Sequence, residues 1–159
     1  MSCDAIAFSA MLWFASSSAA PVTMAVPALS APASVAGEPL FADIMRRAGG
    51  LKLQAETYRK SLAADPVAPA APLAGAEAFG AEIAELSALD MKGHLTLKER
   101  GAVDDLKCIL RGIAQDLPEK LAAIKAAGTI KDQDLALRDM VYLLNDNVEV
   151  ITAPPTPAA

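Results

Sequence analysis

Apolar residues in the C-terminal half of the chain recur every third or fourth position, which is the spacing of one face of an α-helix. Three such stripes can be followed: Phe79, Ile83 and Leu86; Val103, Leu106, Leu110, Ile113 and Leu117; and Leu137, Val141, Leu144, Val148 and Ile151. The connections between them are short, and short links favour antiparallel neighbours. The pattern therefore predicts an all-α fold, a small antiparallel bundle of three or four helices over residues 76–151.

Local signals suggest where these helices begin and end. Gly93 is expected to end the first helix, and Thr96 with Glu99 fits a capping box that would start the next one. Pro118 is expected to kink that helix or to force a restart, because proline cannot continue the hydrogen-bond ladder. The last helix should begin near Thr129 and fray at 145–147, where Asn and Asp favour turns.

Residues 38–64 form a further amphipathic helix, which begins at a proline that the first turn tolerates. Its apolar stripe consists of Phe41, Ile44, Ala48, Leu51, Ala55, Tyr58 and Leu62. Gly49 and Gly50 interrupt it and cost about 1 kcal/mol each, so the segment is either one weakened helix or two short helices with a hinge. The stripe needs a partner surface, either elsewhere in this chain or on another protein.

Three segments rich in Ala and Pro frame these helices: a disordered or signal-like segment at 1–37, a linker at 65–75 and a disordered tail at 152–159. Residues 5–15 have the length of a signal-peptide core, but Asp4 stands where a positive charge would be expected. Three interpretations stay open. The segment is an atypical export signal, or Met24 is the true start of a cytoplasmic protein, or this is a disordered tail that binds a partner or directs type III secretion.

Composition narrows the function classes. The net charge is −5 and no basic face is concentrated anywhere, which disfavours nucleic-acid binding. Alanine contributes 35 residues to the 53% hydrophobic fraction, and aromatic residues make up only 4% of the chain, which favours closely packed helices over a β-sandwich. Residues 38–64 are basic and residues 65–91 acidic, and the simplest reading is that the two segments pair within the fold.

Catalytic signatures are missing from the sequence. It contains no nucleotide-binding, zinc-protease, serine-hydrolase or CxxC motif, so we expect no enzyme activity, no cofactor and no metal site. His94 is the only histidine, and we expect it to be an exposed loop residue. The run GHLTLKERG around it resembles, over these few residues only, the acceptor motif of histidine phosphotransfer domains, with Lys98 four and Gly101 seven positions after the histidine. That resemblance implies a signalling module with His94 as the phosphate acceptor.

The leading hypothesis is a non-catalytic interaction or regulatory protein that binds another protein, or itself as a homo-oligomer, through the 38–64 helix. The predicted contact residues are Phe41, Ile44, Leu51, Tyr58, Leu62, Arg46 and Arg47. No transmembrane segment is expected, because the apolar run at 5–15 is too short to span a bilayer. The predicted location is cytoplasmic, with a periplasmic or secreted protein as the alternative if residues 5–20 act as a signal.

Overall fold

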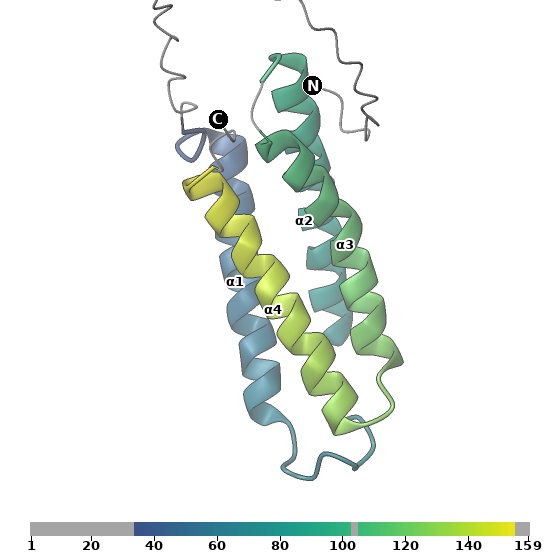
Figure 1. Ribbon diagram of the computed structural model, residues 1–159. Helices are drawn as coiled ribbons and strands as arrows, with labels where there is room; N and C mark the ends of the chain where they lie inside the picture. The colour runs from purple at the N-terminus through teal and green to yellow at the C-terminus, as the bar shows by residue number, and fades with distance from the viewer. Residues whose placement is uncertain (1–33, 103–104, 155–159) are drawn as a thin grey trace, which may run out of the picture. The chain divides into compact units, whose positions relative to one another are not determined.

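The computed structural model describes residues 34–102 and 105–154, which form an all-α bundle of four helices (Figure 1). The helices are α1 (Pro39–Ser61), α2 (Ala76–Glu99), α3 (Leu106–Ala126) and α4 (Ile130–Thr152). Each helix packs against the next in sequence, and α4 closes the bundle against α1. Consecutive helices run antiparallel, so the predicted fold class is confirmed.

Helix α1 is a full member of this bundle. Its apolar stripe lies in the common core with residues from the other three helices. The helix runs through Gly49 and Gly50 without a break, so the hinge alternative does not apply. Of the two partner surfaces that the sequence left open, the structure shows the one within the same chain: the 38–64 helix is docked on the 76–151 bundle.

Helix α2 is longer than the sequence suggested. It continues through Gly93 to Glu99, so Gly93 does not end a helix, and Thr96 and Glu99 lie in the last turn of α2 instead of capping a new one. The apolar stripe explains the difference, because Leu97 extends it by one further turn and is buried. Packing against the core outweighs the capping preference of Thr96, which is worth only about 1 kcal/mol.

Helix α3 passes through Pro118 as a single element, so no new helix begins there. Proline lacks the N–H that would normally bond to the carbonyl four residues earlier, at Ala114. The Ser87 hydroxyl of α2 donates to that carbonyl oxygen at 2.7 Å instead. A side chain from the neighbouring helix thus satisfies the acceptor that Pro118 leaves without its usual donor.

The Pro/Ala segment at 65–75 is not a free linker, because its backbone is bonded to the start of α4. Pro66 and Ala68 accept from the backbone N–H groups of Lys131 and Ile130, at 3.0 and 2.9 Å. The buried Gln133 amide exchanges two hydrogen bonds with the backbone of Ala71. Because the first N–H groups of a helix have no partner within it, this segment supplies acceptors that α4 would otherwise lack.

Helix α4 begins as expected, since the Thr129 hydroxyl accepts from the Asp132 N–H at 3.2 Å. It does not fray at 145–147, because Asn147 is buried and the helix continues to Thr152. At the other end of the described chain, Val35 packs against the core, so the predicted boundary at residue 37 lies slightly too late. The predictions for residues 1–33 and 155–159 fall outside the described residues.

Candidate functional site

The structure places the apolar contact residues predicted for α1 inside the bundle. Phe41, Ile44, Leu51 and Tyr58 are buried, and Leu62 is half-buried against the core. Tyr58 packs edge-on against Phe79 of α2 with ring centroids 5.5 Å apart, and its hydroxyl donates to the Ala74 carbonyl. The side of α1 that the sequence singled out is thus used for folding.

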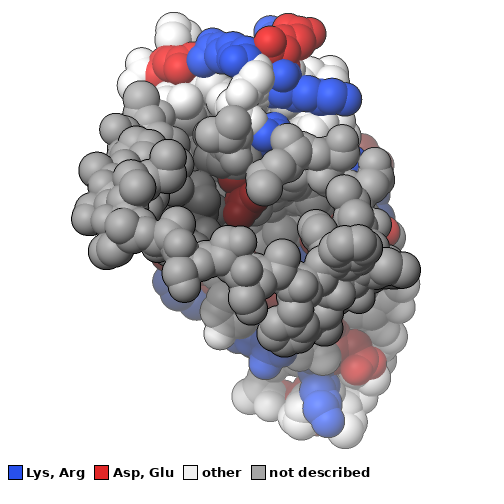
Figure 2. All heavy atoms as spheres, turned by 45° about the horizontal axis from the view of Figure 1, so that its top comes forward, with Lys and Arg blue, Asp and Glu red and all other residues white. Residues whose placement is uncertain are grey.

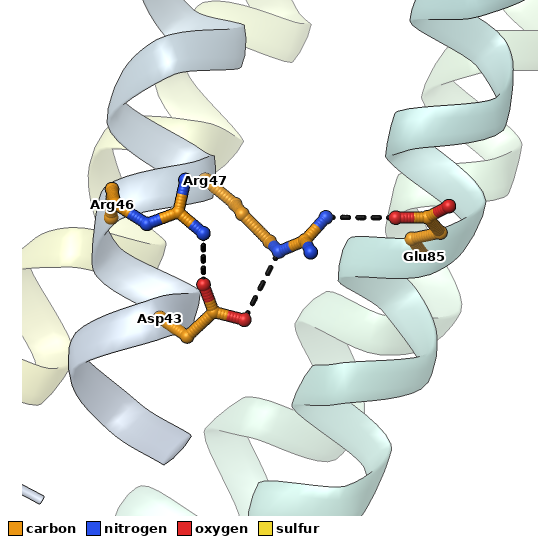
Figure 3. A network of polar contacts seen from close by, with 4 residues as sticks. All are labelled: Asp43, Arg46, Arg47 and Glu85. Carbon is orange, nitrogen blue, oxygen red and sulfur yellow. Dashed lines mark hydrogen bonds and ion pairs between the residues drawn. The ribbon is translucent and has the colours of Figure 1, made fainter. Parts of the chain in front are cut away.

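Arg46 and Arg47 lie at the surface of α1, around the carboxylate of Asp43 (Figure 3). Arg47 donates to Asp43 at 3.1 Å and, across to α2, to Glu85 at 2.8 Å, while Arg46 bonds only to Asp43 in this network. The hydrogen bond from Arg46, supported by Arg47, lowers the pKa of the Asp43 carboxyl. Arg47 therefore ties α1 to α2, and Arg46 is the more exposed of the two.

Pairing between the basic and acidic segments occurs at this point of the bundle. Arg47 comes from the basic 38–64 segment and Glu85 from the acidic 65–91 segment. A second base of α1, Arg59, pairs instead with Asp134 of α4 at 2.8 Å. Ion pairs of this exposure contribute at most about 1 kcal/mol, so they set the approach of the helices more than the stability of the fold.

The opposite side of α1 faces solvent. We define the α1 outer face as the stripe of exposed residues Ala42, Arg46, Gly50, Leu53, Thr57 and Lys60. Leu53 lies at its middle with 64% of its surface exposed, a large value for a leucine in a helix. Single exposed leucines are common on protein surfaces, so the exposure of Leu53 indicates a contact surface only if the residues around it do so too.

Those neighbours include two glycines that the fold does not require. A Cβ built at Gly49 or Gly50 would meet no atom within 4 Å. Each glycine weakens an exposed helix interior by about 1 kcal/mol relative to alanine. The pair therefore lowers the stability of α1 by about 2 kcal/mol, and no contact within the described chain accounts for it.

A buried polar pair crosses the centre of the bundle between two helices that lie diagonally opposite. Asn147 of α4 donates to Asp90 of α2 at 2.8 Å, and both side chains are fully buried. The second carboxyl oxygen of Asp90, Oδ1, and the single side-chain oxygen of Asn147 have no hydrogen-bond partner in the structure. Burial raises the pKa of the Asp90 carboxyl to about 7, against the smaller opposing effect of the Asn147 hydrogen bond.

A proton on Asp90 resolves both unpaired atoms at once. A protonated Asp90 Oδ1 would be a donor, and the free Asn147 oxygen is an acceptor. The acid and the amide would then bond reciprocally, and no buried charge would remain. None of the larger pockets on the described surface includes either residue, so we interpret the pair as a structural polar contact that fixes how α2 and α4 align.

His94 is not an exposed loop residue. It lies in α2, is only 6% exposed, and its Nδ1 bonds to the backbone carbonyl of Lys107. The carbonyl can only accept, so Nδ1 carries the proton. A phosphate acceptor histidine has to reach a partner protein, and this burial argues against the phosphotransfer alternative.

A cavity of about 400 Å³ lies where the 65–75 segment crosses the bundle. Its walls are mainly apolar, with Leu73, Phe79, Leu121 and Ile124 among them. The Gln133 amide also lines it, but both ends of that amide are bonded to Ala71. Ligand pockets usually hold polar groups that orient the ligand, and this cavity has no buried one left to do so.

On the described part of the face drawn in Figure 2, basic and acidic side chains lie next to one another. No group of three or more His, Cys, Asp or Glu within residues 34–102 and 105–154 could hold a metal ion. None of the four helices is long and apolar enough to cross a bilayer.

Of the contact residues predicted on α1, Arg46 belongs to the α1 outer face, whereas the apolar ones lie in the core or against it. Leu53 and Gly50 lie outside the apolar stripe, so periodicity alone gave them no role. A usable signal was present, because two adjacent glycines are rare choices in a helix that has to be stable. The Asp90–Asn147 pair had no sequence signal, since Asp90 reads as an ordinary polar helix residue.

Comparisons with known proteins identified no match to this chain. No protein-family model matches the chain, no curated protein sequence matches it, and no solved structure matches its fold significantly.

Proposed function

We propose that this protein is a non-catalytic interaction protein that contacts a partner through the α1 outer face. The observation that carries the proposal is the weakness built into the exposed middle of α1. Gly49 and Gly50 reduce helix stability at positions where an added Cβ would meet no atom within 4 Å, and the neighbouring Leu53 is 64% exposed. A second helix backbone can approach closely at glycine, which gives these residues a use that folding does not.

The other surfaces offer less support for a different function. The buried Asp90 lines none of the four best-formed pockets among the described residues, and the 400 Å³ cavity has no free buried polar group, so neither suggests a catalytic centre. The predicted apolar contact residues of α1 would become available only if the helix left the bundle. The cellular location of the protein, cytoplasmic or exported, stays a prediction, because residues 5–20 lie outside the described residues.

The proposal is tested by photo-cross-linking in cells of the source organism. A photoreactive phenylalanine analogue is placed at Leu53, or at Ala88 on the exposed side of α2 as a matched control. We expect a discrete cross-linked species from position 53 and none from position 88. The same species should disappear when Gly50→Leu is added, because the leucine fills the gap beside position 53.

Cross-linking that is equal at positions 53 and 88, or absent at position 53, would rule out the α1 outer face as the contact surface. The mass of the cross-linked species also identifies the partner class. Twice the mass of the chain indicates self-association, and any other mass indicates a different protein.

A further inference from the structure

We propose that the partner on the α1 outer face is a second copy of this chain, bound through an antiparallel α1–α1 contact. This inference rests on the proposed function and names the partner of the same surface. It follows from the order of side chains along the stripe, which is complementary to its own reverse. Closed two-fold dimers require such self-complementarity, because the same patch serves both copies.

The shape of the stripe matches its reversed copy at the centre. If a two-fold axis passes beside residues 51 and 52, Gly50 of one copy lies opposite Leu53 of the other, and the same contact repeats on the far side of the axis. Each exposed leucine then enters the gap that a glycine leaves. One knob-into-hole contact thus accounts for both the exposed leucine and the glycine opposite it.

Charged residues on the stripe meet carboxylates that lie beside it in the same register. Asp43 of one copy lies opposite Lys60 of the other, and Arg46 lies opposite Thr57 and next to Glu56. Asp43 and Lys60 are both at the surface, and Lys60 forms no ion pair among the described residues, so it is free to meet the partner's carboxylate. A parallel arrangement would instead bring Asp43 against Asp43 and Lys60 against Lys60, and like charges would oppose it.

One helix face is smaller than the surface that a permanent dimer buries. We therefore expect weak, reversible association, with a dissociation constant on the order of 100 µM. Association of this strength is concentration-dependent in the range that sedimentation equilibrium measures. It would leave the monomer fold intact, since no core residue takes part.

Sedimentation equilibrium of the full chain tests the proposal, with Gly50→Leu as the variant and Gly112→Leu as its matched control. Both positions are helical, and a Cβ at either meets no atom within 4 Å, but Gly112 lies in α3. Gly50→Leu should raise the dissociation constant at least about tenfold while the melting temperature stays the same or rises. Gly112→Leu should leave the dissociation constant within about twofold of the wild type.

Charge exchange tests the antiparallel register. Lys60→Asp should weaken association, because Asp43 then faces an acidic residue, and adding Asp43→Lys in the same chain should restore it. A wild-type chain that stays monomeric up to about 1 mM overturns the proposal, as does an unchanged dissociation constant in Gly50→Leu. If the chain is monomeric but position 53 cross-links to a different protein in cells, the self-association inference fails and the proposed function stands.

Discussion

Asp90→Asn is expected to raise the free energy of unfolding at pH 8 by about 4 kcal/mol and to change it little at pH 4. Asparagine has the shape of protonated aspartic acid. Its amide can donate to the free oxygen of Asn147 and accept the existing hydrogen bond, so the buried pair is kept. The substitution removes only the ability to carry a negative charge in the core.

The direction follows from the two pKa values of Asp90. Burial raises its pKa from 3.8 to about 7 in the folded state, so between these values the folded protein holds a proton that the unfolded chain has released. The stability that this proton provides is complete below pH 4 and is lost as pH rises through 7. Each pH unit in that window is worth about 1.4 kcal/mol, which gives the magnitude above.

Urea unfolding of both proteins at intervals from pH 4 to pH 8 measures the effect. The ion-paired carboxyls Glu38, Asp43 and Asp134 have lowered pKa values and give stability that is lost on acidification, but they are the same in both proteins and cancel in the difference. Parallel pH profiles for wild type and variant would show that Asp90 does not titrate as the structure requires.

Gly93→Leu is expected to lower the free energy of unfolding by at least about 3 kcal/mol. Three core side chains surround this glycine. Even a Cβ would lie 3.2 Å from Leu110, 3.3 Å from Phe41 and 3.4 Å from Ile44, distances at which the neighbours have to move. All three neighbours are fully buried, so a larger side chain has no space to enter without displacing the core.

Gly112→Leu serves again as the matched control for this substitution, because it makes the same chemical change in an open helical position. Leucine is the better helix former, so the control should be stabilised by up to about 1 kcal/mol. Chemical denaturation of the two variants beside the wild type gives both values. Equal effects at positions 93 and 112 would mean that α2 does not approach α1 and α3 as closely as described.

Much of the fold could be read from periodicity, because the stripes on α1, α3 and α4 are nearly continuous. The boundary of α2 could not, since Asp90, Gly93 and His94 occupy core positions and interrupt its apolar pattern. The capping motif at Thr96 and Glu99 therefore appeared to start a new helix, whereas both residues lie within α2. The restart expected at Pro118 was wrong for a related reason. The hydroxyl that replaces the missing N–H of Pro118 belongs to Ser87, which lies 31 positions away in the sequence.

The candidate site was harder to predict than the fold. An amphipathic stripe shows that a helix has a partner, but it does not show whether the partner belongs to the same chain. The answer depends on the 65–75 segment, whose backbone bonds to the first turn of α4 bring the end of α1 back beside the bundle. Backbone hydrogen bonds of this kind cannot be predicted from residue type, because they do not depend on the side chain.

If α1 is a fixed part of the bundle, its apolar stripe stays buried and only its outer face can meet a partner. Native-state amide hydrogen exchange, measured on dilute protein at rising denaturant, tests this most directly. We expect the amides of Ile44, Leu51 and Ala55 to exchange only through global unfolding, with the same free energy as those of Leu110 and Leu144. Exchange of the α1 amides through a separate opening of clearly lower free energy would contradict the account, because the stripe would then be available to a partner.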